Sequence, residues 1–151
     1  MSKYKIGLWV FGFLYAFPGW AFDCYYTLVK DSCWTKFNVT VDVVDAVTSR
    51  PLTTVTIPAG EVWKREKFAC EPHQKLSYKA HFSPEIWQGD EQKTFNGLKF
   101  WELPQAIKTN ETAWNVEVCY PKQFLSVPLP PDVIGNCKCE FSAVTPLKTQ
   151  K

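Results

Sequence analysis

The sequence predicts an all-β protein built as an antiparallel β-sandwich and held together by disulfide bonds. Three observations predict this fold. Apolar and polar residues alternate with period two in several short segments, no segment carries helical apolar spacing with end caps, and six cysteines follow a segment with the features of an export signal.

Residues 1–21 have the three parts of a secretory signal peptide. Lys3 and Lys5 make the start basic, residues 6–17 are apolar except for two glycines, and Gly19 and Ala21 are the small residues of a cleavage site. The apolar stretch is shorter than the roughly 20 residues that span a bilayer. We therefore expect cleavage after Ala21, no direct membrane insertion, and a periplasmic or extracellular location.

The expected mature protein has no charge bias. Both basic residues removed with the signal are lysines, so the remaining basic and acidic side chains are equal in number. A nucleic-acid-binding surface usually needs a basic excess, so no nucleic acid is expected as a partner. Residues 22–142 are long enough for one hydrophobic core and form the predicted single domain, and residues 143–151 form an expected flexible tail.

Five segments have strand character. Alternation marks residues 37–43, 75–82 and 114–118, and β-branched or aromatic runs mark 52–57 and 61–69, which are joined by the turn sequence Pro58-Ala59-Gly60. Short strands at this spacing predict a sandwich of about seven strands with an immunoglobulin-like core. The expected core side chains are Val39, Val41, Val43, Tyr78, Phe82, Trp114, Val116 and Val118.

The sequence becomes rich in proline after Phe124. Val127, Pro128, Leu129, Pro130 and Pro131 cannot supply the backbone donors of a central strand. We expect them to run as an extended, proline-rich C-terminal arm across the surface.

The cysteines predict three disulfides. Cys24, Cys33, Cys70, Cys119, Cys137 and Cys139 are an even set in an exported chain, and six cysteines permit 15 connectivities. Cys137 and Cys139 flank one residue and would close a strained ring with each other. The favoured arrangement pairs Cys70 with Cys119 and joins Cys137 and Cys139 to Cys24 and Cys33, which ties the chain ends together.

Aromatic residues are the unusual part of the composition. Trp87, Phe95, Phe100 and Trp101 lie around a predicted loop, and together with the arm 127–131 they are the candidate partner-binding surface. The alternative is a satellite hydrophobic cluster beneath a long loop.

Catalytic and metal-binding patterns are weak. Periodicity brings neither His73 nor His81 beside a serine or cysteine, and disulfides would consume the thiols that a cysteine nucleophile requires. Cys137-Lys138-Cys139 is a single half-site with unusual spacing for zinc. The sequence therefore predicts a protein that is not an enzyme, with no catalytic residues, metal or cofactor.

Several stretches together resemble small periplasmic proteins found with the type IVB (Dot/Icm) secretion apparatus. They are residues 38–43, 56–60, 68–70, 82–84, 86–87, 100–104, 113–116, 127–131 and 135–139. The resemblance implies a non-catalytic structural accessory of a bacterial envelope complex, with protein subunits of that complex as partners. The alternative function is a secreted carbohydrate- or peptide-binding module that uses exposed aromatic side chains.

Overall fold

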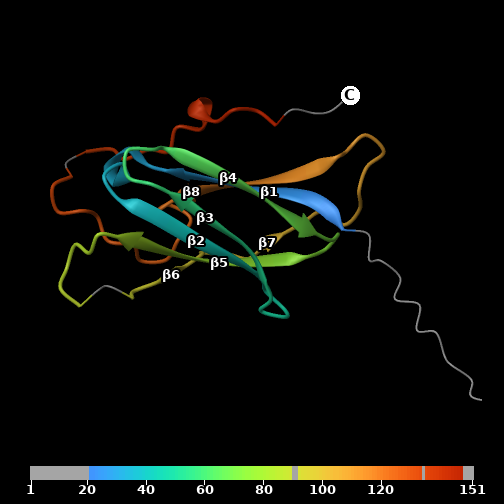
Figure 1. The fold of residues 1–151 in the computed structure, drawn as a ribbon, viewed down its shortest axis with the longest axis horizontal. Coiled ribbons are helices and arrows are strands. Elements are labelled where there is room, and N and C mark those ends of the chain that lie inside the picture. Colours follow the sequence, from blue (N-terminus) through green and yellow to red (C-terminus); the bar gives the residue numbers. More distant parts are fainter. Residues whose placement is uncertain (1–20, 90–91, 134, 148–151) are drawn as a thin grey trace, which may run out of the picture.

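Two stacked β-sheets form the protein (Figure 1). The structure, a computed structural model, describes residues 21–89, 92–133 and 135–147, and the predicted signal peptide lies outside them except for Ala21. The predicted β-sandwich is confirmed. Among the described residues, no helix is long and apolar enough to cross a membrane.

One sheet has three strands in the order β4-β1-β8, with β1 spanning Phe22–Lys30, β4 spanning Trp63–Cys70 and β8 spanning Ala113–Tyr120. β1 pairs with β4 antiparallel and with β8 parallel. The expectation of purely antiparallel pairing is therefore wrong for the pair β1–β8, because alternation along a strand does not encode the direction of its neighbour. β1 itself was not among the predicted strands. It is a central strand, and Thr27 and Val29 on its outer face are fully buried, so it lacks period-two alternation.

The second sheet has the order β3-β2-β5-β6, and β7 also pairs with β5. Its long strands are β2 (Asn38–Asp45), β3 (Pro51–Ile57) and β5 (Lys75–Ser83), which agree with the predicted segments to within a few residues. β6 (Phe95–Asn96) and β7 (Trp101–Glu102) each have only two residues. They make the short edge of this sheet.

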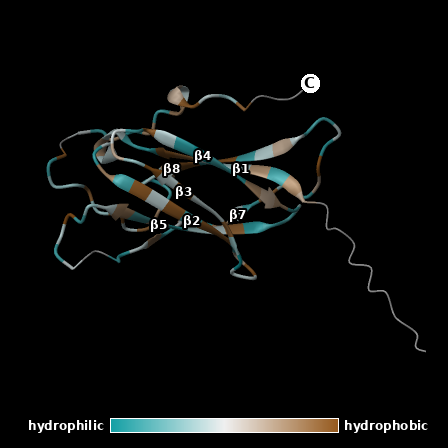
Figure 2. Cartoon of the chain, viewed as in Figure 1, coloured by the Kyte–Doolittle hydropathy of each residue, from teal (hydrophilic) through white to brown (hydrophobic). Residues whose placement is uncertain are grey.

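The core lies between the sheets, and the alternation that builds it can be followed along the strands in Figure 2. All predicted core side chains are buried except Phe82, which is half-buried against the core. Within the part of the chain that the structure describes, the largest fully buried side chain is Trp34, from the 3₁₀ helix Ser32–Trp34 (η1). Asp31 caps this helix, because its carboxylate accepts a hydrogen bond from the backbone N–H of Cys33 at 3.0 Å.

All six cysteines are paired, as Cys24–Cys70, Cys33–Cys137 and Cys119–Cys139. The number of disulfides is confirmed, and of the two predicted links between Cys137 or Cys139 and Cys24 or Cys33, one is present, Cys33–Cys137. The predicted link from Cys70 to Cys119 is wrong, and Cys139 does not reach Cys24. The reason is the unpredicted strand β1, because its antiparallel pairing with β4 brings Cys24 beside Cys70.

The C-terminal segment lies over the outer face of the three-stranded sheet (Figure 1). The disulfide Cys119–Cys139 holds it to β8, and Arg65 of β4 donates a hydrogen bond to the carbonyl oxygen of Thr145 at 2.8 Å. The predicted domain boundary after Ser142 falls inside a second 3₁₀ helix, Phe141–Ala143 (η2). Residues 127–131 before it contain neither strand nor helix.

Candidate binding site

The predicted aromatic surface separates into exposed and inward-facing rings. Phe100 is 66% exposed and Trp87 is 38% exposed. Phe95 is buried opposite Ala80, so its ring belongs to the core and not to a binding surface. Trp101 pairs with the core residue Leu76 and is half-buried against the same core. Neighbouring cross-strand residues share a face, so Trp101 also points inward.

Phe100 is displayed by a bulge in the sheet edge. β6 pairs Phe95 with Ala80, and β7 pairs Trp101 with Leu76. Ser77 and Tyr78 of β5 therefore face the four residues 97–100 on the edge strand, which is two residues too many for regular pairing. Leu98 and Phe100 project from this bulge and are 50% and 66% exposed, and re-aiming a side chain in this way is a common effect of bulges.

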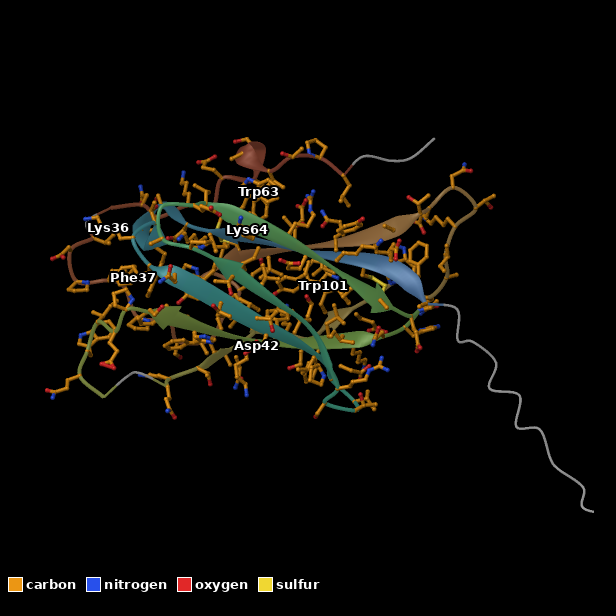
Figure 3. All side chains as sticks on the ribbon, viewed as in Figure 1. Lys36, Phe37, Asp42, Trp63, Lys64 and Trp101 are labelled. Atoms are coloured by element: carbon orange, nitrogen blue, oxygen red, sulfur yellow. A yellow bond between two sulfur atoms is a disulfide. The ribbon has the colours of Figure 1, made fainter. Side chains whose placement is uncertain are left out.

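This projection creates a groove on the outer face of the five-stranded sheet, which we call the bulge groove. It has a volume of about 590 Å³. Its floor is made by outward side chains of β2 and β5, and its wall by the bulge and by Ser49 from the β2–β3 turn. The lining residues are Asp42, Val44, Ser49, Ser77, Tyr78, Lys79, Asn96, Gly97, Leu98, Lys99 and Phe100. Figure 3 places Asp42 on the outer side of this sheet and Trp101 between the two sheets.

The apolar part of the site extends beyond the groove. The backbone N–H of Leu125 donates to the carbonyl oxygen of Asn96 at 2.8 Å, and Gly97 pairs with Phe124 in an antiparallel bridge. This register sets Leu125 opposite Asn96 on the outer side. Leu125 is 48% exposed and Leu98 is 50% exposed, so with Phe100 they form an apolar surface at the bulge.

The charges of the groove are mainly basic. Asp42 accepts a hydrogen bond from the hydroxyl of Thr54 at 2.8 Å, and Lys79 stands opposite Asp42 in the β2–β5 register. Lys99 adds a second ammonium group at the rim. Among the described residues, the ion pairs are Lys64–Glu61 and Lys67–Asp23, so neither groove lysine has an acidic partner within 4 Å.

Gly97 sets the position of the bulge. A Cβ atom at this residue would lie 2.8 Å from Cδ2 of Tyr78, which is far inside van der Waals contact. Tyr78 is only 4% exposed, and its ring packs edge-on against Phe124 and Tyr26. The ring cannot swing away, so any larger residue at position 97 must push the bulge outward.

Gly97→Ala is therefore expected to lower the free energy of unfolding by about 1 to 3 kcal/mol, the usual cost of overpacking. Chemical denaturation measures this change. The neighbouring substitution Asn96→Ala removes an exposed side chain and should stay within about 0.5 kcal/mol of wild type. Equal free energies of unfolding for Gly97→Ala and Asn96→Ala would show that the Tyr78 ring does not restrict the side chain at position 97.

The candidates for other chemistry do not come together around a cleft. His73 lies in the turn before β5, and His81 lies on the outer face of β5. Asp31, Cys33 and Cys137 have ligand-type atoms within 4.8 Å of one another. The two sulfur atoms, however, are bonded to each other in a disulfide, which leaves only the carboxylate as a free ligand.

Sequence reasoning missed a buried lysine, Lys30, at the end of β1. Its side chain points inward after Cys24, Tyr26 and Leu28 and is 1% exposed. The ammonium donates to three carbonyl oxygens, those of Phe37 at 2.6 Å, Pro58 at 2.8 Å and Thr35 at 3.3 Å. These bonds use all three ammonium protons, so Lys30 ties η1 to the β3–β4 turn instead of facing a ligand. Because β1 lacks period-two alternation, the sequence pattern did not mark Lys30 as a core position.

Desolvation by burial lowers the pKa of Lys30 to about 8, partly opposed by the negative charge of Glu61. In the unfolded chain the pKa is about 10.4, so between these values the unfolded state binds more protons. The free energy of unfolding should therefore rise by about 1 to 2 kcal/mol from pH 7 to pH 9.5. Denaturant titrations across this range measure the rise, and Lys30→Met should remove it. The same pH dependence in Lys30→Met would assign it to other groups.

Comparison with known protein families, curated proteins and solved structures finds no match to this chain.

Proposed function

We propose that this protein is an exported, non-catalytic interaction protein, an accessory subunit of a bacterial envelope assembly, and that it binds a protein partner in the bulge groove. The observation that carries the proposal is the bulge itself. It gathers the exposed apolar side chains of Leu98, Phe100 and Leu125 beside a groove, and an apolar centre with a polar rim is the usual composition of a protein interface.

The chemistry of the groove indicates the partner segment. The ammonium groups of Lys79 and Lys99 outnumber the single carboxylate of Asp42. A partner segment with acidic groups beside apolar ones therefore complements the charge of the site. Exposed charge pairs are screened by salt. Binding should accordingly weaken as the salt concentration rises, while the apolar contact with Phe100 persists.

Export is supported by two observations. The chain begins with a signal-like segment, and three disulfides are characteristic of oxidising compartments. The assignment to a type IV secretion complex in the periplasm rests on the sequence resemblance described above.

The second candidate function is carbohydrate binding, and one observation favours it. The exposed ring of Phe100 shares the groove with the polar side chains of Asn96 and Asp42, and sugar sites combine an aromatic face with such hydrogen-bonding groups. A protein partner is preferred because Leu98 and Leu125 widen the apolar surface beyond one ring.

Affinity purification from detergent-solubilised envelope separates the two functions. We expect stoichiometric recovery of a protein partner by the wild type, and loss of that partner when Phe100→Ser is combined with Lys99→Glu. Val62→Ser is the matched control, because Val62 is 39% exposed and lies outside the groove. Recovery of the wild type as a lone monomer that binds glycans would refute the protein-partner function.

A further inference from the structure

The three disulfides are interleaved along the chain. They join Cys24 to Cys70, Cys33 to Cys137 and Cys119 to Cys139. Each bond therefore passes over at least one cysteine that belongs to another bond, and no cysteine is bonded to the next one in the sequence. A chain that is exported from its N-terminus, as proposed above, presents its thiols to the oxidising compartment in sequence order, so neighbouring cysteines meet first.

Cys24 meets Cys33 before it meets Cys70. The probability that two thiols of an unfolded chain meet falls as about the −3/2 power of the number of residues between them. Cys33 follows Cys24 by 9 residues, whereas Cys70 lies 46 residues from Cys24. Closure of the shorter loop is therefore favoured by about tenfold. The first disulfide to form is Cys24–Cys33, which the folded protein lacks.

A bond between Cys24 and Cys33 is incompatible with the fold. Cys24 lies near the start of β1, and Cys33 lies in η1, beyond the end of that strand. The extended strand from Cys24 to Lys30 spans about 20 Å. The three further residues to Cys33 reach back about 11 Å at most, so the two Cα atoms stay farther apart than the roughly 7 Å that a disulfide tolerates. A chain with this bond cannot form β1, the central strand of its sheet.

The next pair in the sequence, Cys70 and Cys119, is excluded by the same strand. Cys70 is paired with Phe22 in the register of β1 with β4, and Cys119 is paired with Val29 in the register of β1 with β8. These two residues of β1 are about 23 Å apart along an extended strand. Sequential oxidation thus yields two disulfides that must both be broken before the three-stranded sheet forms.

We propose that this protein is a substrate of a thiol–disulfide isomerase in the compartment that receives it. A thiolate of the isomerase attacks Sγ of Cys33, forms a mixed disulfide and releases the Cys24 thiolate. This thiolate attacks Cys70 in the bond Cys70–Cys119, which forms Cys24–Cys70 and releases the Cys119 thiolate. Cys137 then attacks Cys33, which completes Cys33–Cys137 and restores the thiolate of the enzyme. The proton lost by Cys137 is taken up by Cys119.

These exchanges conserve the number of disulfides and need no oxidant. The third bond, Cys119–Cys139, forms by oxidation, in which the disulfide of an oxidase accepts two electrons and two protons from the two thiols and becomes a dithiol.

Exchange ends when the sandwich closes. Cys24, Cys70 and Cys119 are buried in the folded protein. An enzyme thiolate cannot reach these sulfur atoms there, because exchange requires access to the sulfur that is attacked. Cys33 and Cys137 are both only half-buried, so their bond stays within reach longest. Native pairs therefore accumulate as the core forms.

The test follows the reoxidation of the purified, disulfide-bonded protein after reduction and unfolding in denaturant. One sample receives a disulfide oxidase alone, and the other also receives a catalytic amount of a thiol–disulfide isomerase. Alkylation and peptide mapping identify the pairs. We expect Cys24–Cys33 to exceed Cys24–Cys70 by about tenfold at the earliest times, and the oxidase alone to leave native pairs in only about one tenth of the molecules. The isomerase should bring most molecules to the native pairs.

Two double variants separate interleaving from the mere number of cysteines. Cys33→Ala with Cys137→Ala leaves four cysteines whose native pairs are sequential, and the shortest loop that they can close, Cys119–Cys139, is native. This variant should form its native pairs equally well with and without the isomerase. Cys119→Ala with Cys139→Ala is the matched control. Its two remaining bonds are still interleaved, so it should keep the isomerase dependence of the wild type.

Native pairs in most wild-type molecules with the oxidase alone would overturn the proposal, as would an early excess of Cys24–Cys70 over Cys24–Cys33. An equal effect of the isomerase on the two double variants would also overturn it. The first two readouts use the wild type, so they hold even if a double variant fails to fold. All of these measurements use purified protein without a binding partner. Loss of the groove partner in Phe100→Ser therefore leaves them unaffected.

Discussion

Replacing Cys33 and Cys137 together by alanine is expected to lower the free energy of unfolding by about 4 to 5 kcal/mol. These two cysteines are 104 residues apart, so their disulfide restricts most of the unfolded chain. It also fixes η1 to the segment around Cys137, which follows residues 127–131. Denaturant unfolding of the oxidised protein measures the change.

The disulfide Cys119–Cys139 is the matched comparison. It closes a loop of only 20 residues, and its removal should cost about 3 kcal/mol. A larger loss for this pair than for Cys33–Cys137 would contradict the loop-length explanation. It would indicate instead that Cys119–Cys139 stabilises the fold mainly by holding the C-terminal segment over the three-stranded sheet.

Trp34→Ala is expected to lower the free energy of unfolding by about 3 to 5 kcal/mol. The indole is fully buried, and its ring centroid lies 4.7 Å from that of Phe82, 5.1 Å from Tyr120 and 5.2 Å from Phe37. Alanine would leave a cavity in the middle of this aromatic cluster.

Trp34→Phe should cost much less, below about 1.5 kcal/mol. The indole N–H of Trp34 is buried without a hydrogen-bond partner among the described residues, so phenylalanine keeps most of the packing and removes an unsatisfied donor. A thermal or chemical unfolding series compares the three proteins. Similar losses for Trp34→Phe and Trp34→Ala would mean that the N–H has a partner that the packing alone does not reveal.

Period-two alternation was sufficient to predict the strands that face water on one side. It located β2, β5 and β8 and the core positions Val41 and Trp114, because burial on one face imposes the pattern directly. It failed for β1, which is covered on both faces. Missing β1 also led to the wrong partner for Cys70.

The binding site was predicted only in part. Phe100 was named as a candidate and is exposed, but the same argument named Phe95 and Trp101, which face inward. Composition identifies a cluster of aromatic residues, but it does not show which rings face the core and which face solvent. That assignment depends on the two-residue shift between β6 and β7, which appears only once both strands are paired with β5.

The dissociation constant of the recovered protein partner for wild type and for Phe100→Ser tests the central claim most directly, with Val62→Ser as the control. The two substitutions remove an exposed apolar side chain from inside and from outside the bulge groove, respectively. If the partner docks in the groove, Phe100→Ser should weaken binding by more than about 2 kcal/mol, as expected for an aromatic hot spot, while Val62→Ser binds as tightly as wild type. Equal affinity of all three proteins would place the interface elsewhere and contradict the proposed function of the groove.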